Sequence, residues 1–109
     1  MTKKLEGKTL AKDAFSFQLI DKTGQVVETV KNKADGSVDF KTLAFTKTGT
    51  YTYTIREVKG DAEGITYDNS EIKVTITVTN ENGNLLSTVS YEGGKDSFTS
   101  SYQPDRKSV

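Results

Sequence analysis

The sequence predicts an all-β protein, a single antiparallel β-sandwich of about seven or eight strands. Threonine alternates with apolar residues along several segments, which suits a pleated surface that is buried on one side. Turn signals recur roughly every 8–12 residues, the spacing expected of short strands. The one proline is Pro104, so no proline interrupts a strand.

Four strands are expected in the N-terminal third, separated by the turns 21–24 and 32–36. The second strand points Phe15, Phe17 and Leu19 inward, and the fourth aligns Val38 with Phe40. An alternative for residues 26–33 is a short helical segment that groups its three valines. The strands are expected at residues 3–7, 14–20, 25–30 and 37–40.

After an irregular segment at residues 41–49, the C-terminal part of the sequence predicts four more strands. The cleanest alternation is EIKVTITV, which points one apolar row inward, and Asn82-Gly83 is the strongest two-residue hairpin signal. Residues 59–70 are expected to be a loop, and residues 103–109 a polar tail or linker. The strands are expected at residues 50–58, 71–78, 85–91 and 97–102.

Composition limits what the protein does. The chain has 109 residues, enough for one domain, and its 15 Lys and Arg balance its 15 Asp and Glu. This balance argues against a nucleic-acid or membrane-surface role, and no apolar run is long enough to span a bilayer. With no Cys and no His, disulfides, thiolate or histidine metal sites and a Ser-His-Asp triad are excluded. We expect no enzyme activity and no cofactor or metal.

One strand raises a question about a charge. In TYTYTIREV (50–58), Glu57 shares one side with the apolar residues Tyr51, Tyr53 and Ile55. A carboxylate that faces a core must be paired, protonated or strongly hydrogen-bonded. The alternative is a strand that frays at Val58 and leaves the carboxylate in solvent.

Two other strands offer polar partners for such a carboxylate. Lys3 shares its parity with Leu5 on the first strand, and Ser100 lies between Phe98 and Tyr102 on one side of the last strand. These side chains and Glu57 are therefore expected to converge in the core. The alternative for Lys3 is solvation, as for most lysines near a terminus.

The chain resembles the isopeptide-linkage domain of streptococcal major pilins and related Gram-positive surface proteins. The similar pieces run in the family order over nearly the whole chain: KKLEG, FSFQL, VKNKADGSVDF, KTGTYTYTIREV, GITYD, VTITV and FTSSY. The resemblance implies an immunoglobulin-like, CnaB-like sandwich at residues 1–102. It also implies an extracellular location at the cell wall surface.

The resemblance further implies an internal covalent bond. In the family, a Lys of the first strand attacks an Asn amide of the last strand, a buried Glu moves the proton, and ammonia leaves. These roles fall on Lys3 and Glu57, but Ser100 stands where the Asn belongs and has no carbonyl carbon. Asp96 is a poor substitute, because it lies about 13 Å upstream along the strand. We therefore predict that no Lys3–Ser100 isopeptide forms.

Three functions are compatible with this sequence. The first is a structural module in the stalk or shaft of a surface adhesin or pilin, monomeric when isolated and joined to neighbouring domains of a larger surface protein. The second is an adhesin domain that binds a host protein or glycan through loops, above all 59–70 with Tyr67, although this loop also reads as a plain connection. The third is an engineered scaffold or one half of a split covalent-coupling pair.

Overall fold

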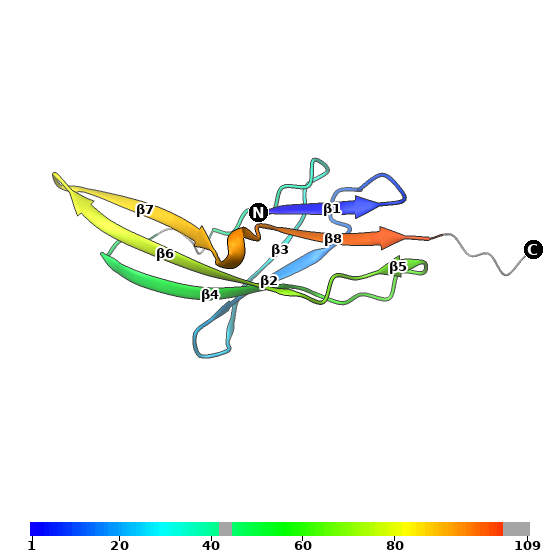
Figure 1. Ribbon diagram of the computed structural model, residues 1–109, viewed down its shortest axis with the longest axis horizontal. Coiled ribbons are helices and arrows are strands. Elements are labelled where there is room, and N and C mark those ends of the chain that lie inside the picture. Colours follow the sequence, from blue (N-terminus) through cyan, green and yellow to red (C-terminus); the bar gives the residue numbers. More distant parts are fainter. Residues whose placement is uncertain (42–44, 104–109) are drawn as a thin grey trace, which may run out of the picture.

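Two sheets pack into a sandwich in the computed structural model, which describes residues 1–41 and 45–103 (Figure 1). Within these residues the only helical element is a short 3₁₀ turn, η1 (Glu92–Gly94), so the all-β prediction is confirmed. None of the described helical structure is long and apolar enough to cross a membrane. The five-stranded sheet has the order β3 (Val26–Lys31), β2 (Ser16–Asp21), β4 (Gly49–Glu57), β6 (Glu71–Glu81) and β7 (Asn84–Tyr91), and the three-stranded sheet has β1 (Thr2–Glu6), β8 (Ser97–Tyr102) and β5 (Ile65–Thr66).

One strand pair departs from the antiparallel pattern. The first and last strands, β1 and β8, run parallel, with Lys3 opposite Phe98 and Leu5 opposite Ser100. Parallel neighbours need a long crossover connection, and here the crossover is nearly the whole chain. Every other described strand pair is antiparallel. The two ends of the domain are therefore held side by side.

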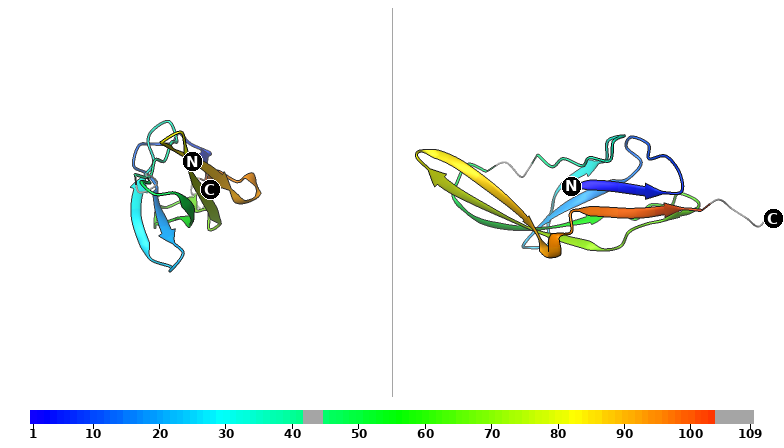
Figure 2. Two further views of the ribbon diagram at one scale, coloured as in Figure 1. Left: turned by 90° about the vertical axis from the view of Figure 1, so that its left-hand side faces the viewer. Right: turned by 45° about the horizontal axis from the view of Figure 1, so that its top comes forward.

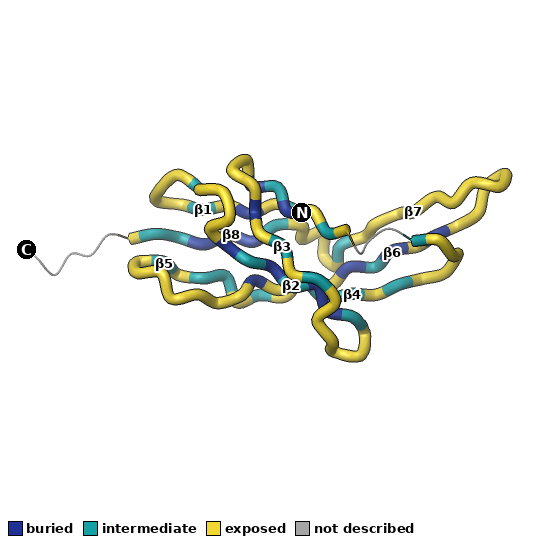
Figure 3. The backbone as a smooth tube through the Cα atoms, turned by 180° about the vertical axis from the view of Figure 1, so that it is seen from behind, coloured by how far each residue is buried: buried dark blue, intermediate teal, exposed yellow. Residues whose placement is uncertain are grey.

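The core lies where the three-stranded sheet covers the five-stranded sheet. The inward row predicted for β6 is buried, and so are the inward residues predicted for β2 (Figure 3). Phe17 and Phe98 meet across the two sheets with ring centroids 5.5 Å apart. The buried apolar core comprises Phe15, Phe17, Leu19, Val38, Ile55, Ile72, Val74, Ile76, Val78 and Phe98.

The β6–β7 hairpin extends beyond the covered part of the sandwich (Figure 2). Its turn is at Asn82-Gly83, as predicted, and both residues have positive φ, 55° and 86°, as a type I′ hairpin turn requires. Residues 79–90 are all exposed, including Leu85, Leu86 and Val89. Beyond Val78, where the pairing of β6 with β4 ends, this arm is a two-stranded ribbon, and none of the described residues forms a layer over residues 79–90.

The structure corrects three expectations. Residues 37–40 do not form a strand: Ser37 makes only an isolated bridge to Thr2, because this segment runs along β1 and buries Val38 there. The helical alternative for residues 26–33 is wrong, since β3 pairs with β2. The expected loop 59–70 contains β5, which pairs with β8. Residues 42–44 of the expected irregular segment and 104–109 of the expected tail lie outside the described residues.

Candidate functional site

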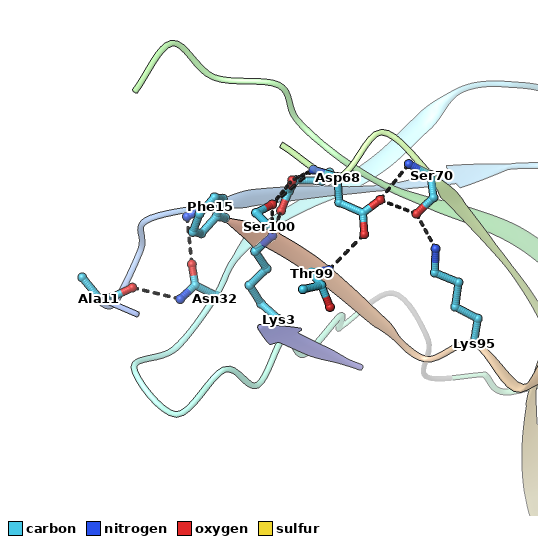
Figure 4. A network of polar contacts seen from close by, with 10 residues as sticks. Lys3, Ala11, Phe15, Asn32, Asp68, Ser70, Lys95, Thr99 and Ser100 are labelled. Atoms are coloured by element: carbon cyan, nitrogen blue, oxygen red, sulfur yellow. Dashed lines mark hydrogen bonds and ion pairs between the residues drawn. The ribbon is translucent and has the colours of Figure 1, made fainter. Parts of the chain in front are cut away.

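The structure brings Lys3, Glu57 and Ser100 together inside the sandwich. Figure 4 shows the Lys3 amine beside Ser100. The three residues are 2%, 7% and 2% exposed. Lys3 Nζ forms an ion pair with Glu57 Oε1 and donates a hydrogen bond to Ser100 Oγ at 2.6 Å. Ser100 Oγ in turn donates to Glu57 Oε2 at 3.2 Å. The buried convergence predicted from strand parity is therefore present, and the alternatives that left Lys3 or Glu57 in solvent are wrong.

Strand register explains why these three side chains meet. Lys3 and Ser100 point inward from the adjacent parallel strands β1 and β8. Glu57 ends β4 in the other sheet, where it lies opposite Phe17 of β2. The ion pair therefore connects the two sheets across the core. By contrast, the side chain of Asp96 is exposed just before β8 begins, outside this cluster.

Aromatic side chains surround the Lys3 amine. Its Nζ lies 4.1 Å from the ring centroid of Phe15 and 6.0 Å from that of Phe17. Burial lowers the pKa of Lys3, because removal from water penalises the ammonium more than the contacts with Glu57 favour it. A lower pKa favours the neutral amine, which is the nucleophilic form.

Asp68 joins the site although the sequence analysis did not single it out. Its backbone N–H donates to Glu57 Oε2 at 2.9 Å and to Ser100 Oγ at 3.1 Å. Its carboxylate accepts hydrogen bonds from the backbone N–H groups of Ser70 and Thr99, each at 2.9 Å, and from the Ser70 hydroxyl. Although burial raises the pKa of Asp68, these hydrogen bonds outweigh it and lower the pKa.

A sequence signal for Asp68 was available. The segment Asp68-Asn69-Ser70 has the D-x-S/T pattern, in which the carboxylate binds the residue two positions later. The same pattern recurs in the exposed turns that begin at Asp21 and Asp35, where the same contacts form. The pattern predicts a turn, but it does not tell which of the three turns lies against the core.

A groove of about 740 Å³ lies beside the site, between the end of β4 and the segment that contains β5. Its lining includes Glu57 and Asp68, together with the more exposed side chains of Arg56, Lys59 and Asn69. The loop predicted as a candidate binding surface therefore has two roles in the structure. Its Asp68 side packs against the buried cluster, while its outer side chains line the groove.

The cluster brings an amine, a carboxylate and a hydroxyl into contact with one another. The Lys3 amine, a carboxylate and a hydroxyl are present, but a hydroxyl cannot accept an amine to form an amide. Every buried polar side-chain atom among the described residues has a hydrogen-bond partner. No group of His, Cys, Asp and Glu within the described ranges is arranged to hold a metal ion.

Comparisons with known proteins identify the family and the fold of the chain. Residues 1–103 match the model of the family described as FctA, the Spy0128-like isopeptide containing domain. Crystal structures of two variants of the Streptococcus pyogenes major pilin, one Asn to Ala and one Glu to Ala, each match with a TM-score of 0.61 and 20% identity. The matches cover 94% of this chain and 49% of the pilin.

The major pilin protein T-13 of Streptococcus pyogenes serotype GAS131465 matches similarly, with a TM-score of 0.60 and 20% identity over 94% of this chain and 50% of that one. The chain thus spans about half the length of these pilins, and at this identity the likeness shows the fold. No curated protein sequence matches. Because the family model covers nearly the whole chain, this protein belongs to the Spy0128-like isopeptide-containing domains, a family of structural domains rather than enzymes.

Proposed function

We propose that this chain is a structural module in the stalk or shaft of a Gram-positive surface adhesin or pilin, and that Ser100 has altered its isopeptide site. Lys3 and Glu57 occupy the positions of the family's amine and proton-transfer groups, and Ser100 occupies that of the reactive Asn. The observation that supports this most is the buried contact of Lys3 with both other residues. Family membership and the match to half of a pilin chain agree with it.

The module would work as one part of a longer surface protein. We infer a domain at residues 1–102, with residues 103–109 leading into the following chain. The C-terminal end of β8 lies far from the β6–β7 arm, so a following domain would attach at the end of the sandwich opposite that arm (Figure 1). Such a domain is expected to be monomeric when isolated and to carry its load through the parallel β1–β8 pair.

Intact mass tests the altered site. The protein as it stands should have the full mass of its sequence, whereas Ser100→Asn should lose the mass of one ammonia as Lys3 becomes linked. Lys3→Ala combined with Ser100→Asn is the control and should keep its full mass. Full mass for Ser100→Asn alone, in a folded protein, would contradict the proposal.

Stability provides a second readout of the restored link. The bond would close a loop between residues that are 97 positions apart in the sequence. By analogy with disulfides, such closure stabilises by about 4–5 kcal/mol in the chain-entropy model. Urea unfolding of Ser100→Asn should therefore show a gain of about this size relative to the unlinked protein with Ser100, which keeps the Lys3–Glu57 pair.

A second candidate function is ligand binding by the groove beside the site. The observation that favours it is the polar, partly exposed lining with Arg56, Lys59 and Asn69. We infer that a host protein or glycan bound there would lose affinity with Arg56→Ala but not with Lys22→Ala on the β2–β3 turn. If no protein or glycan in a panel of host molecules binds, the binding function is rejected and the structural function is the remaining proposal.

A further inference from the structure

The backbone N–H of Asp68 is shared between the two acceptors that face the Lys3 amine. It lies 2.9 Å from Glu57 Oε2 and 3.1 Å from Ser100 Oγ, and both of these residues are buried. Among the described residues, it is the one backbone N–H that donates hydrogen bonds to both side chains. A preorganised backbone donor beside buried side chains is the kind of group that stabilises a developing negative charge.

The position of Ser100 Oγ shows what this donor faces. A serine Oγ is bonded to Cβ, just as the Cγ of an asparagine is, so the two atoms take the same place in the same rotamer. Lys3 Nζ is 2.6 Å from that place, so a small outward shift puts the amine at the roughly 3–3.5 Å from which it attacks a carbon. A carbonyl oxygen is about 1.2 Å from its carbon, so one that turns toward the Asp68 N–H comes within hydrogen-bond reach of it.

The Asp68 carboxylate holds the backbone N–H of the same residue in place, because it is itself hydrogen-bonded to Ser70 and to Thr99. One oxygen accepts from both the backbone and the hydroxyl of Ser70, and the other accepts from the backbone N–H of Thr99, the neighbour of Ser100 on β8 (Figure 4). Lys95 Nζ contacts the Ser70 hydroxyl as well. The turn is thus attached to the strand that carries residue 100, one position away from it.

We propose that the backbone N–H of Asp68 is the oxyanion donor for acyl transfer at position 100, and that the Asp68 carboxylate is the group that positions it. This inference rests on the proposed function, because it assigns a role in the reaction that Ser100 prevents. It adds a fourth participant to the amine, the carboxylate and the electrophile.

The reaction of the Ser100→Asn protein balances with these groups. The neutral Lys3 amine forms a C–N bond to the new side-chain carbonyl carbon, and negative charge develops on the carbonyl oxygen, facing the Asp68 N–H. Glu57 takes a proton from the amine nitrogen and delivers one to the amide nitrogen. The C–N bond of the side-chain amide then breaks and ammonia leaves, so an amide and an amine become an amide and ammonia.

The test measures how fast ammonia is lost, in the Ser100→Asn background after refolding, by intact mass over time. Adding Asp68→Ala should slow the loss by about tenfold or more, because the donor is no longer held in place. Adding Asp68→Asn, a milder change that keeps one acceptor oxygen, should slow it less. The matched control is Asp21→Ala, which removes the same kind of turn contacts on the β2–β3 turn and should leave the rate unchanged.

Rates are measured well below the melting temperature of each variant, with folding checked by circular dichroism, so that lost stability does not lower the rate. If Asp68→Ala fails to fold, Asp68→Asn and Ser70→Ala still test the assignment. Equal rates with and without the Asp68 changes would overturn this assignment and leave the proposed function standing. A folded Ser100→Asn protein that never loses ammonia would overturn the proposed function and this assignment together.

Discussion

The covered half of the sandwich and the β6–β7 arm use the same strand chemistry in different surroundings. Ile76 and Val89 are register partners on β6 and β7 and point to the same side of the sheet. Ile76 belongs to the core and is 0% exposed, whereas Val89 is 44% exposed. The difference shows that alternation alone does not determine burial, which depends on whether a second layer lies above the strand.

The polar groups of the two regions differ in the same way. The covered half holds a lysine, a glutamate and a serine that are almost completely buried and satisfy one another. In the arm, the Asn80 side chain accepts a hydrogen bond from the Gly83 N–H of the turn, and all of residues 79–90 are exposed to water. Removing one polar partner should therefore be costly in the first region and nearly neutral in the second.

The largest effect is expected from Glu57→Ala, which leaves the Lys3 amine buried without its partner. Breaking a buried pair costs about 3–5 kcal/mol, measured as the free energy of unfolding in urea. The double variant Lys3→Met with Glu57→Gln should recover part of this loss, because no charge is left unpaired. Unchanged melting temperatures for both Glu57→Ala and Lys3→Ala would show that the pair is not buried in solution.

A slightly smaller effect is expected when the two register partners are truncated. Ile76→Ala should cost about 2–5 kcal/mol, because it removes buried methyl groups and leaves a cavity. Val89→Ala should change the free energy of unfolding by less than about 0.5 kcal/mol, as exposed substitutions usually do. Similar losses for both in urea would mean that a layer covers the arm in solution.

Two glycines extend the comparison to the backbone. Gly36 and Gly83 both have positive φ, 90° and 86°, but a Cβ on Gly36 would lie 2.6 Å from the Lys3 carbonyl oxygen, whereas one on Gly83 meets nothing within 4 Å. Gly83→Ala should cost about 1–2 kcal/mol for the left-handed conformation alone. Gly36→Ala should cost clearly more, since it must also displace β1. Equal losses by thermal or urea unfolding would contradict this close approach.

Much of the fold could be predicted from residue patterns. The period-2 rows of β2 and β6 and the Asn82-Gly83 turn are local features, and each formed as expected. The segment 37–40 was not predictable in this way, because its buried Val38 fits a strand equally well. Its actual course depends on β1 lying alongside.

In the candidate site, too, some residues could be predicted from local patterns and one could not. Parity placed Lys3, Glu57 and Ser100 on inward faces, because a strand alternates its side chains with little ambiguity. Strand parity could not identify Asp68 as part of the site, because the role of Asp68 arises from the tertiary contact of a turn with β8. Local patterns thus predicted the side chains that point into the core, but not the backbone donor that meets them.

The smallest effect is expected from the pH dependence of the Asp68 turn. The folded pKa of Asp68 is lowered, so its contribution to stability is present above the unfolded value of 3.8 and is lost as pH falls through the folded pKa. At pH 7, Asp68→Asn should cost roughly 1–2 kcal/mol, the value of charged hydrogen bonds discounted for partial exposure. The difference between the two proteins should shrink as unfolding is followed from pH 5 toward pH 2.

The exposed turn at Asp35 is the matched comparison for this last effect. Its carboxylate makes the same contacts to Ser37, and these hydrogen bonds likewise lower its pKa. Because water and salt screen an exposed carboxylate, Asp35→Asn should show a smaller difference, and one that falls further in 1 M salt, where the screening length is about 3 Å. An Asp68→Asn difference that stays constant with pH would mean that the carboxylate is not what holds this turn against β8. Its N–H would then be positioned by the chain on either side.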